Sequence, residues 1–74
     1  MKAVEIQIFA RATLLQLPLA LRREIGHRVF DIAAGNYQGL VSFGGGVYSF
    51  EVTGEVAVYI EDRIDRIVVF HIVR

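Results

Sequence analysis

The sequence predicts a small α+β domain, in which a mainly antiparallel sheet of about four strands is packed by one main helix. Two observations favour this class. Only residues 18–35 repeat their apolar side chains at helical spacing, whereas most of the remaining chain alternates apolar and polar residues or is apolar throughout. The length of 74 residues suits one small core. We therefore expect a single domain over residues 1–74 with the order strand, helix, strand, strand, strand.

The main helix is predicted from an apolar stripe and from the residues at its two ends. Apolar side chains in residues 21–32 recur every three or four positions and so lie along one side of a helix. Pro18 suits the first turn, where its missing N–H is no loss, and Gly35 can adopt the left-handed conformation that ends a helix. Because a residue before proline disfavours helical dihedrals, we expect a break near Leu17, with residues 11–16 forming a short helical turn or the start of one kinked helix.

The strands are predicted from alternation and from apolar runs. Val4, Ile6 and Ile8 alternate with polar residues, which indicates a strand with one buried face. The later strands are expected at residues 48–52, 55–60 and 66–73, and the last two are apolar on both faces, as is typical inside a sheet. Residues 40–43 can begin a further strand. The glycines at 44–46 then indicate a hairpin or a bulge, because a phosphate-binding loop needs a following Lys-Ser/Thr and a helix.

The composition limits the class of protein. Apolar residues make up 54% of the chain, and this surplus favours a protein partner or a homodimer. The formal net charge is zero, with a balance of +2 over residues 1–37 and −2 over residues 38–74, which argues against a dedicated nucleic-acid binder. The absence of cysteine excludes disulfide and thiolate–metal scaffolds and fits a cytoplasmic location. No apolar run is typical of a signal peptide or long enough to span a bilayer, so we expect no membrane role.

Four motifs follow one another after the first strand. They are Leu-Pro-x-x-Leu-Arg-x-x-Ile at residues 17–25, Gly-x-Tyr-x-Gly-Leu at 35–40, Tyr-x-Phe-x-Val at 48–52, and Ile-Val-Val-x-His-Ile at 67–72. A turn rich in Asp and Glu precedes the last motif. In this order the motifs resemble the RelE/ParE superfamily of toxins from bacterial type II toxin–antitoxin systems. The resemblance covers nearly the whole chain, which is at the short end for that group.

The resemblance implies a small cytoplasmic toxin that a cognate antitoxin holds inactive. Antitoxins of such systems typically wrap the toxin with a helix or add a strand to its sheet. The RelE branch cleaves messenger RNA in the ribosomal A site as a metal-independent endoribonuclease, and the ParE branch poisons DNA gyrase. No cofactor is implied.

Cleavage of the RelE type depends on basic side chains, because a pentavalent phosphate carries extra negative charge that fixed cations stabilise. Family members commonly carry arginines at positions where this chain has Ser49, Glu51 and Val56. A carboxylate at such a position repels a phosphate, and the family's basic tail is also absent. The sequence therefore departs from the family at its catalytic cations.

The remaining candidates for catalysis are His71 and Arg74. An imidazole can act as a general acid or base near neutral pH. The expected register, however, puts His71 in one row with Ile67, Val69 and Val73, and this favours a hydrogen-bonded histidine in the core.

A second candidate is the polar side of the main helix, where Arg22, Arg23 and Arg28 could contact RNA phosphates or an acidic partner. Glu24 and Asp31 dilute this charge, so a solvated helix surface is the simpler interpretation. No set of ligands has metal-binding spacing. The alternative function is a small self-associating domain without toxic activity, which buries its apolar surplus in a homodimer.

Overall fold

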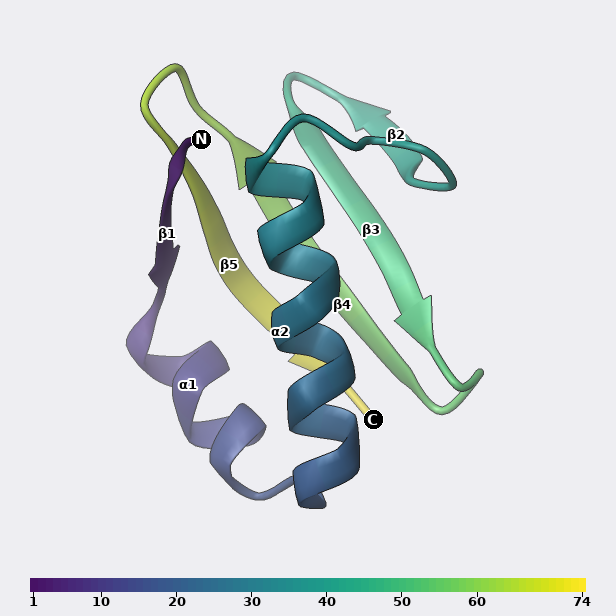
Figure 1. The fold of residues 1–74 in the computed structure, drawn as a ribbon. Helices are drawn as coiled ribbons and strands as arrows, with labels where there is room; N and C mark the ends of the chain where they lie inside the picture. The colour runs from purple at the N-terminus through teal and green to yellow at the C-terminus, as the bar shows by residue number, and fades with distance from the viewer.

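A computed structural model describes all 74 residues as two helices and a five-stranded mixed sheet, an α+β fold (Figure 1). The elements are β1 (Ala3–Ile6), α1 (Ile8–Leu15), α2 (Leu19–Ala33), β2 (Val41–Gly44), β3 (Val47–Val52), β4 (Val56–Asp62) and β5 (Arg66–Val73). The strand order is β1-β5-β4-β3-β2, with β1 parallel to β5 and the other neighbours antiparallel. The predicted class is confirmed. The sheet has five strands rather than four because β2 and β3 form a complete hairpin.

The main helix and the break before it agree with the sequence pattern. Pro18 directly precedes α2, and Gly35 follows it with φ at +105°. Between the helices, Leu17 is buried and the chain turns back on itself (Figure 1). Neither helix is both long and apolar enough to cross a membrane.

The first helix starts earlier than the pattern indicates. Gln7, which directly precedes α1, donates its backbone N–H to the Val69 carbonyl of β5 (2.9 Å). The Gln7 carbonyl then accepts the Arg11 N–H (2.8 Å), which starts the helix. Ile8 is therefore an exposed residue of α1 and not the third apolar position of β1.

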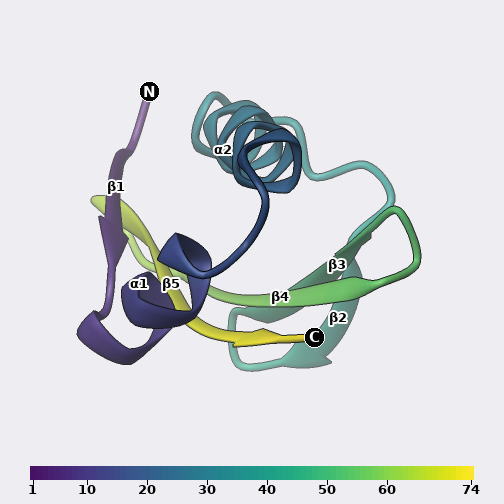
Figure 2. The same ribbon diagram turned by 90° about the horizontal axis from the view of Figure 1, so that it is seen from below.

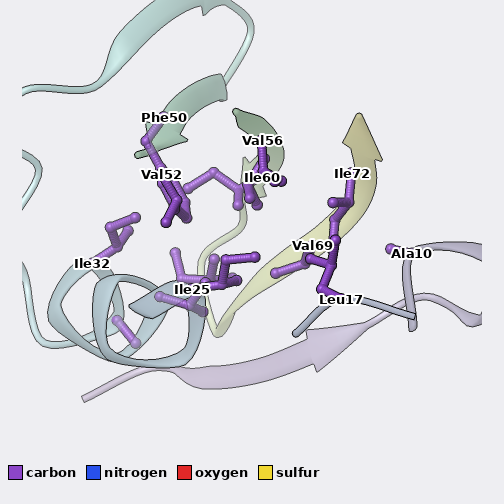
Figure 3. Close-up of a cluster of buried hydrophobic side chains, with 14 residues drawn as sticks. Ala10, Leu17, Ile25, Ile32, Phe50, Val52, Val56, Ile60, Val69 and Ile72 are labelled. Atoms are coloured by element: carbon purple, nitrogen blue, oxygen red, sulfur yellow. The ribbon is translucent and has the colours of Figure 1, made fainter. Parts of the chain in front are cut away.

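One hydrophobic core lies between α2 and one face of the sheet, and α1 closes it at the end of β5 (Figures 2 and 3). Ile32 of α2, Val58 and Ile60 of β4 and Ile67 of β5 have no exposed surface. The core comprises Ala10, Leu17, Ile25, Val29, Ile32, Ala33, Phe50, Val52, Val56, Val58, Ile60, Ile67, Val69 and Ile72.

The triple glycine forms the hairpin turn that the sequence favours over a phosphate-binding loop. Gly45 and Gly46 connect β2 to β3 with φ values of +62° and +81°, which suits the mirror-image turns of two-residue hairpins. Gly46 also lies against β4, because its carbonyl accepts the Asp62 N–H (2.8 Å) and a Cβ on it would stand 3.0 Å from the Asp62 carbonyl oxygen.

A β-bulge in β5 changes the predicted position of His71. Tyr59 of β4 faces His71, but its neighbour Ile60 faces Val69, so Phe70 is an extra residue in β5. The bulge puts His71 on the opposite face of the sheet from Ile67 and Val69, where it is exposed. The interpretation of His71 as a core histidine is therefore wrong, and Ile72 takes the core position instead.

Candidate functional site: an apolar groove between the two helices

A groove of about 290 Å³ lies between α1, α2 and the β1–β5 edge of the sheet. Most of its lining is apolar, and its polar side chains are two arginines. The lining residues are Val4, Ile6, Arg11, Leu14, Arg22, Ile25, Gly26, Val29, Phe30, Val69 and Ile72. A cleft with apolar walls and a few polar groups is the usual form of a binding site.

The local sequence explains why the groove stays open. Arg22, Gly26 and Phe30 follow one another every four residues on α2, so they lie along the same side of the helix. Gly26 has no side chain, and a Cβ placed there would meet nothing within 4 Å. The chain reversal at Leu17 and Pro18 brings α1 alongside as the facing wall (Figure 1).

Positive charge without a partner lies in this groove. Neither Arg11 nor Arg22 takes part in an ion pair. The Nε of Arg22 is covered from solvent and has no hydrogen-bond acceptor. A covered N–H without an acceptor costs about 1–3 kcal/mol, so a carboxylate from a bound partner would remove this cost. The groove therefore suits a ligand that is both apolar and acidic.

The rim of the groove exposes an aromatic side chain. Phe30 is 57% exposed, although it lies beside the buried Val29 on α2. Four further large apolar side chains of the helices are exposed, namely Ile8, Phe9, Leu15 and Leu19. Exposed apolar residues gathered on two adjacent elements are typical of a surface that binds another protein.

The three predicted helix arginines do not share one surface. Arg22 lines the groove, whereas Arg28 points to the other side of α2, with its guanidinium carbon 5.9 Å from the Phe50 ring centroid. Arg28 also donates to the carbonyls of Asn36 and Gln38 and so fixes the loop after the helix. Arg23 is exposed and lines no cavity.

The surroundings of Arg28 are unfavourable for an RNA phosphate. The residues that line the shallow hollow beside it also include Glu24, Asp31 and Glu51. These acidic groups outnumber Arg28 and His27, the basic residues at the same hollow. The basic helix surface expected from the sequence is thus divided, and only Arg22 faces an apolar cleft.

The two candidates for catalysis are also separate. His71 lies on the face of the sheet away from α2, with its ring centroid 5.8 Å from that of Tyr59. Arg74 borders a shallow hollow with Glu51 and Glu55, and His71 does not line that hollow. The structure does not bring His71 and Arg74 into one cavity. No group of three His, Cys, Asp or Glu side chains is placed to hold a metal ion.

An ionic network fixes β1, which forms one wall of the groove. The Lys2 ammonium pairs with Asp62 and donates to the Arg63 carbonyl (2.8 Å), which ties the start of the chain to the β4–β5 turn. The hydrogen bond to Asp62 raises the pKa of Lys2. Burial raises the pKa of Tyr37 above its ordinary value of 10.0, and the nearby Asp62 carboxylate raises it further.

The apolar patterns of the sequence do not predict the groove. Its signal in the sequence is the glycine at position 26, which interrupts a helix between Arg22 and Phe30 without ending it. A glycine inside a helix costs about 1 kcal/mol relative to alanine and usually has a packing or binding reason. Comparisons with protein-family models, curated proteins and solved structures found no match to this chain.

Proposed function

We propose that this protein is the toxin-like component of a type II toxin–antitoxin system, acts in the cytoplasm, and is neutralised when a cognate antitoxin occupies the groove between α1 and α2. The observation that carries the proposal is the apolar groove with the unpartnered Nε of Arg22. An antitoxin segment with apolar residues on one side and a carboxylate among them would fill the groove and accept the hydrogen bond from Arg22.

One of the motifs that support the family resemblance, Leu-Pro-x-x-Leu-Arg-x-x-Ile at residues 17–25, also builds the groove. Leu17 and Pro18 form the reversal between the helices, and Arg22 and Ile25 of the same motif line the cleft. One short stretch of sequence thus supports both the family resemblance and the binding site.

Strand addition is a second way in which such an antitoxin could bind. All four residues of β2 are exposed, and its outer edge has no neighbouring strand. The groove has stronger support, because it offers both apolar walls and an unpaired cation, whereas a free strand edge selects for little beyond backbone hydrogen bonds.

For the cellular target, gyrase inhibition has more support than ribosome-dependent cleavage of messenger RNA. Cleavage needs several cations around one phosphate. Here His71 and Arg74 do not share a cavity, and Arg74 borders two glutamates. Inhibition by binding needs no such cluster.

Controlled expression tests the proposed function. Induction of this chain alone in a bacterial host should arrest growth. Where a short reading frame lies beside the gene, its product is the candidate antitoxin, and its co-expression should restore growth. A supercoiling assay with purified gyrase and a cleavage assay with translating ribosomes then separate the two targets. Normal growth on induction, with the chain present as folded protein, would contradict the proposal and favour the self-associating domain without toxic activity.

A further inference from the structure

The face of the sheet away from α2 does not have the composition of a water-exposed face. An antiparallel sheet with one covered face normally shows polar residues on the other. Here Tyr59 of β4 lies at the centre of four aromatic rings. Its ring centroid is 5.8 Å from that of Phe43, 6.4 Å from that of Phe70 and 5.8 Å from that of His71. We name these four residues the open-face cluster.

Two bulges in the sheet assemble the open-face cluster. The register of β2 against β3 shifts between Ser42 and Gly44, so Phe43 is an extra residue, as Phe70 is in β5. A bulge re-aims the side chain that it inserts. Both extra residues are phenylalanines, and both rings lie beside Tyr59.

Further apolar residues extend this surface. Val41 and Val73, at opposite parts of the sheet, are 55% and 42% exposed. The apolar surface therefore reaches from β2 to β5.

The charges on this face do not suit a nucleic acid. Glu51 stands on it and would repel phosphates, and Glu61 is already paired with Arg63 (2.7 Å). Arg66 is already paired with Glu5 (2.8 Å) and lies 3.6 Å from an Asp65 carboxylate oxygen. In contrast, two copies of a chain with zero formal net charge do not repel each other at long range.

We propose that a second copy of this chain covers the open-face cluster, so that two sheets pack face to face in a homodimer with two-fold symmetry. A two-fold contact presents the same patch on both copies, and an aromatic patch without a dominant charge is compatible with itself. A stable interface of standard size buries about 800 Å² per partner, so the contact has to extend beyond the four rings to the exposed Val41 and Val73.

The proposed dimer leaves the groove of each copy accessible. The helix α2 covers one face of the sheet (Figure 2), and Tyr59 and His71 of the open-face cluster lie on the other face. Self-association and antitoxin binding are therefore independent. Failure of one proposal leaves the other standing.

Two exposed phenylalanines provide a matched pair of variants. Phe43 in the open-face cluster is 58% exposed and Phe30 in the groove is 57% exposed, so neither substitution empties the core. Sedimentation velocity over an about hundred-fold range of concentration should show a wild-type dimer. Phe43→Ser should raise the dissociation constant of the dimer about ten-fold or more, because each dimer loses two apolar contacts. Phe30→Ser should leave this constant unchanged.

NMR spectra recorded during dilution keep the test decisive if Phe43→Ser unfolds. Wild-type signals of Tyr59, His71 and Val73 should shift as the dimer dissociates, and signals of Gly26 and Phe30 should not. A wild-type monomer at every concentration would overturn the proposal, as would a dimer that only Phe30→Ser dissociates. The signals of the open-face cluster could instead shift only when an antitoxin or a single-stranded RNA is added. That result would assign this face to the added partner and would also overturn the proposed dimer.

Discussion

The ring of Tyr59 lies 5.8 Å from the ring of Phe43, centroid to centroid, although β3 runs between the two strands that carry them. Ser49 is the residue of β3 that faces Tyr59, and its small side chain leaves room for the two rings to meet above it. Both rings belong to the open-face cluster, on the side of the sheet away from α2. The protein therefore has a second apolar surface apart from the groove between the two helices.

The core under α2 should supply most of the stability. Ile60 has no exposed surface, and Ile60→Ala is expected to lower the free energy of unfolding by about 2–5 kcal/mol. That is much of the roughly 5 kcal/mol expected for so small a domain. Ile64→Ala is the control, because Ile64 is 98% exposed and its loss should change stability by less than about 0.5 kcal/mol. Urea denaturation measures both, and equal effects would contradict this description of the core.

Two glycine-to-alanine substitutions should change the free energy of unfolding in opposite directions. Gly46→Ala places a Cβ 3.0 Å from the Asp62 carbonyl oxygen at a φ of +81°, and we expect a loss of about 1–3 kcal/mol. Gly26→Ala places a Cβ in open space on a helix and should gain about 0.5–1 kcal/mol. Thermal unfolding of the two variants checks both signs. A stabilised Gly46→Ala variant would show that the β2–β3 turn does not have the described conformation.

Stability should fall at alkaline pH, and Tyr37 should account for part of the fall. Because the folded protein raises the pKa of Tyr37 above 10.0, folding favours the protonated phenol. The stability from this preference is complete below the ordinary pKa and is lost as the pH rises through the raised value. The raised pKa of Lys2 acts with the same sign.

Tyr37→Phe should therefore make the decline of the unfolding free energy above about pH 10 less steep. Urea denaturation at a series of pH values, from neutral into this range, provides the measurement. An unchanged slope in the variant would show that the Tyr37 phenol is not held in its protonated form by the fold.

Local sequence patterns predicted the elements in which the apolar residues are also the buried ones. The stripe of α2, bounded by Pro18 and Gly35, and the two-sided apolar strand β4 both form close to the expected residues. The start of α1 was not predicted because Ile8 continues the apolar alternation of β1. In the structure the Gln7 N–H makes a hydrogen bond to the Val69 carbonyl of β5, and the Gln7 carbonyl then accepts the Arg11 N–H of α1. The first of these bonds joins residues far apart in the sequence, where periodicity gives no information.

The site was less predictable than the fold for the same reason. The bulge at Phe70 moves His71 to the open face, and nothing in an apolar run reveals which residue a bulge will insert. Arg22 and Arg28 lie on the same helix, yet one lines the groove and the other holds the loop at Asn36. Their different roles depend on where α1 and β3 pack against α2.

The affinity of purified antitoxin for matched variants tests the central claim, that the groove between the helices is the site of neutralisation. The candidate antitoxin, the product of a short reading frame found beside the gene, should bind Phe30→Ser about ten-fold more weakly than wild type, because the apolar contact at the groove rim is lost. It should bind Phe43→Ser with unchanged affinity, since Phe43 lies on the opposite face of the sheet. Unchanged binding to Phe30→Ser together with weakened binding to Phe43→Ser would contradict the account and place the antitoxin on the open-face cluster.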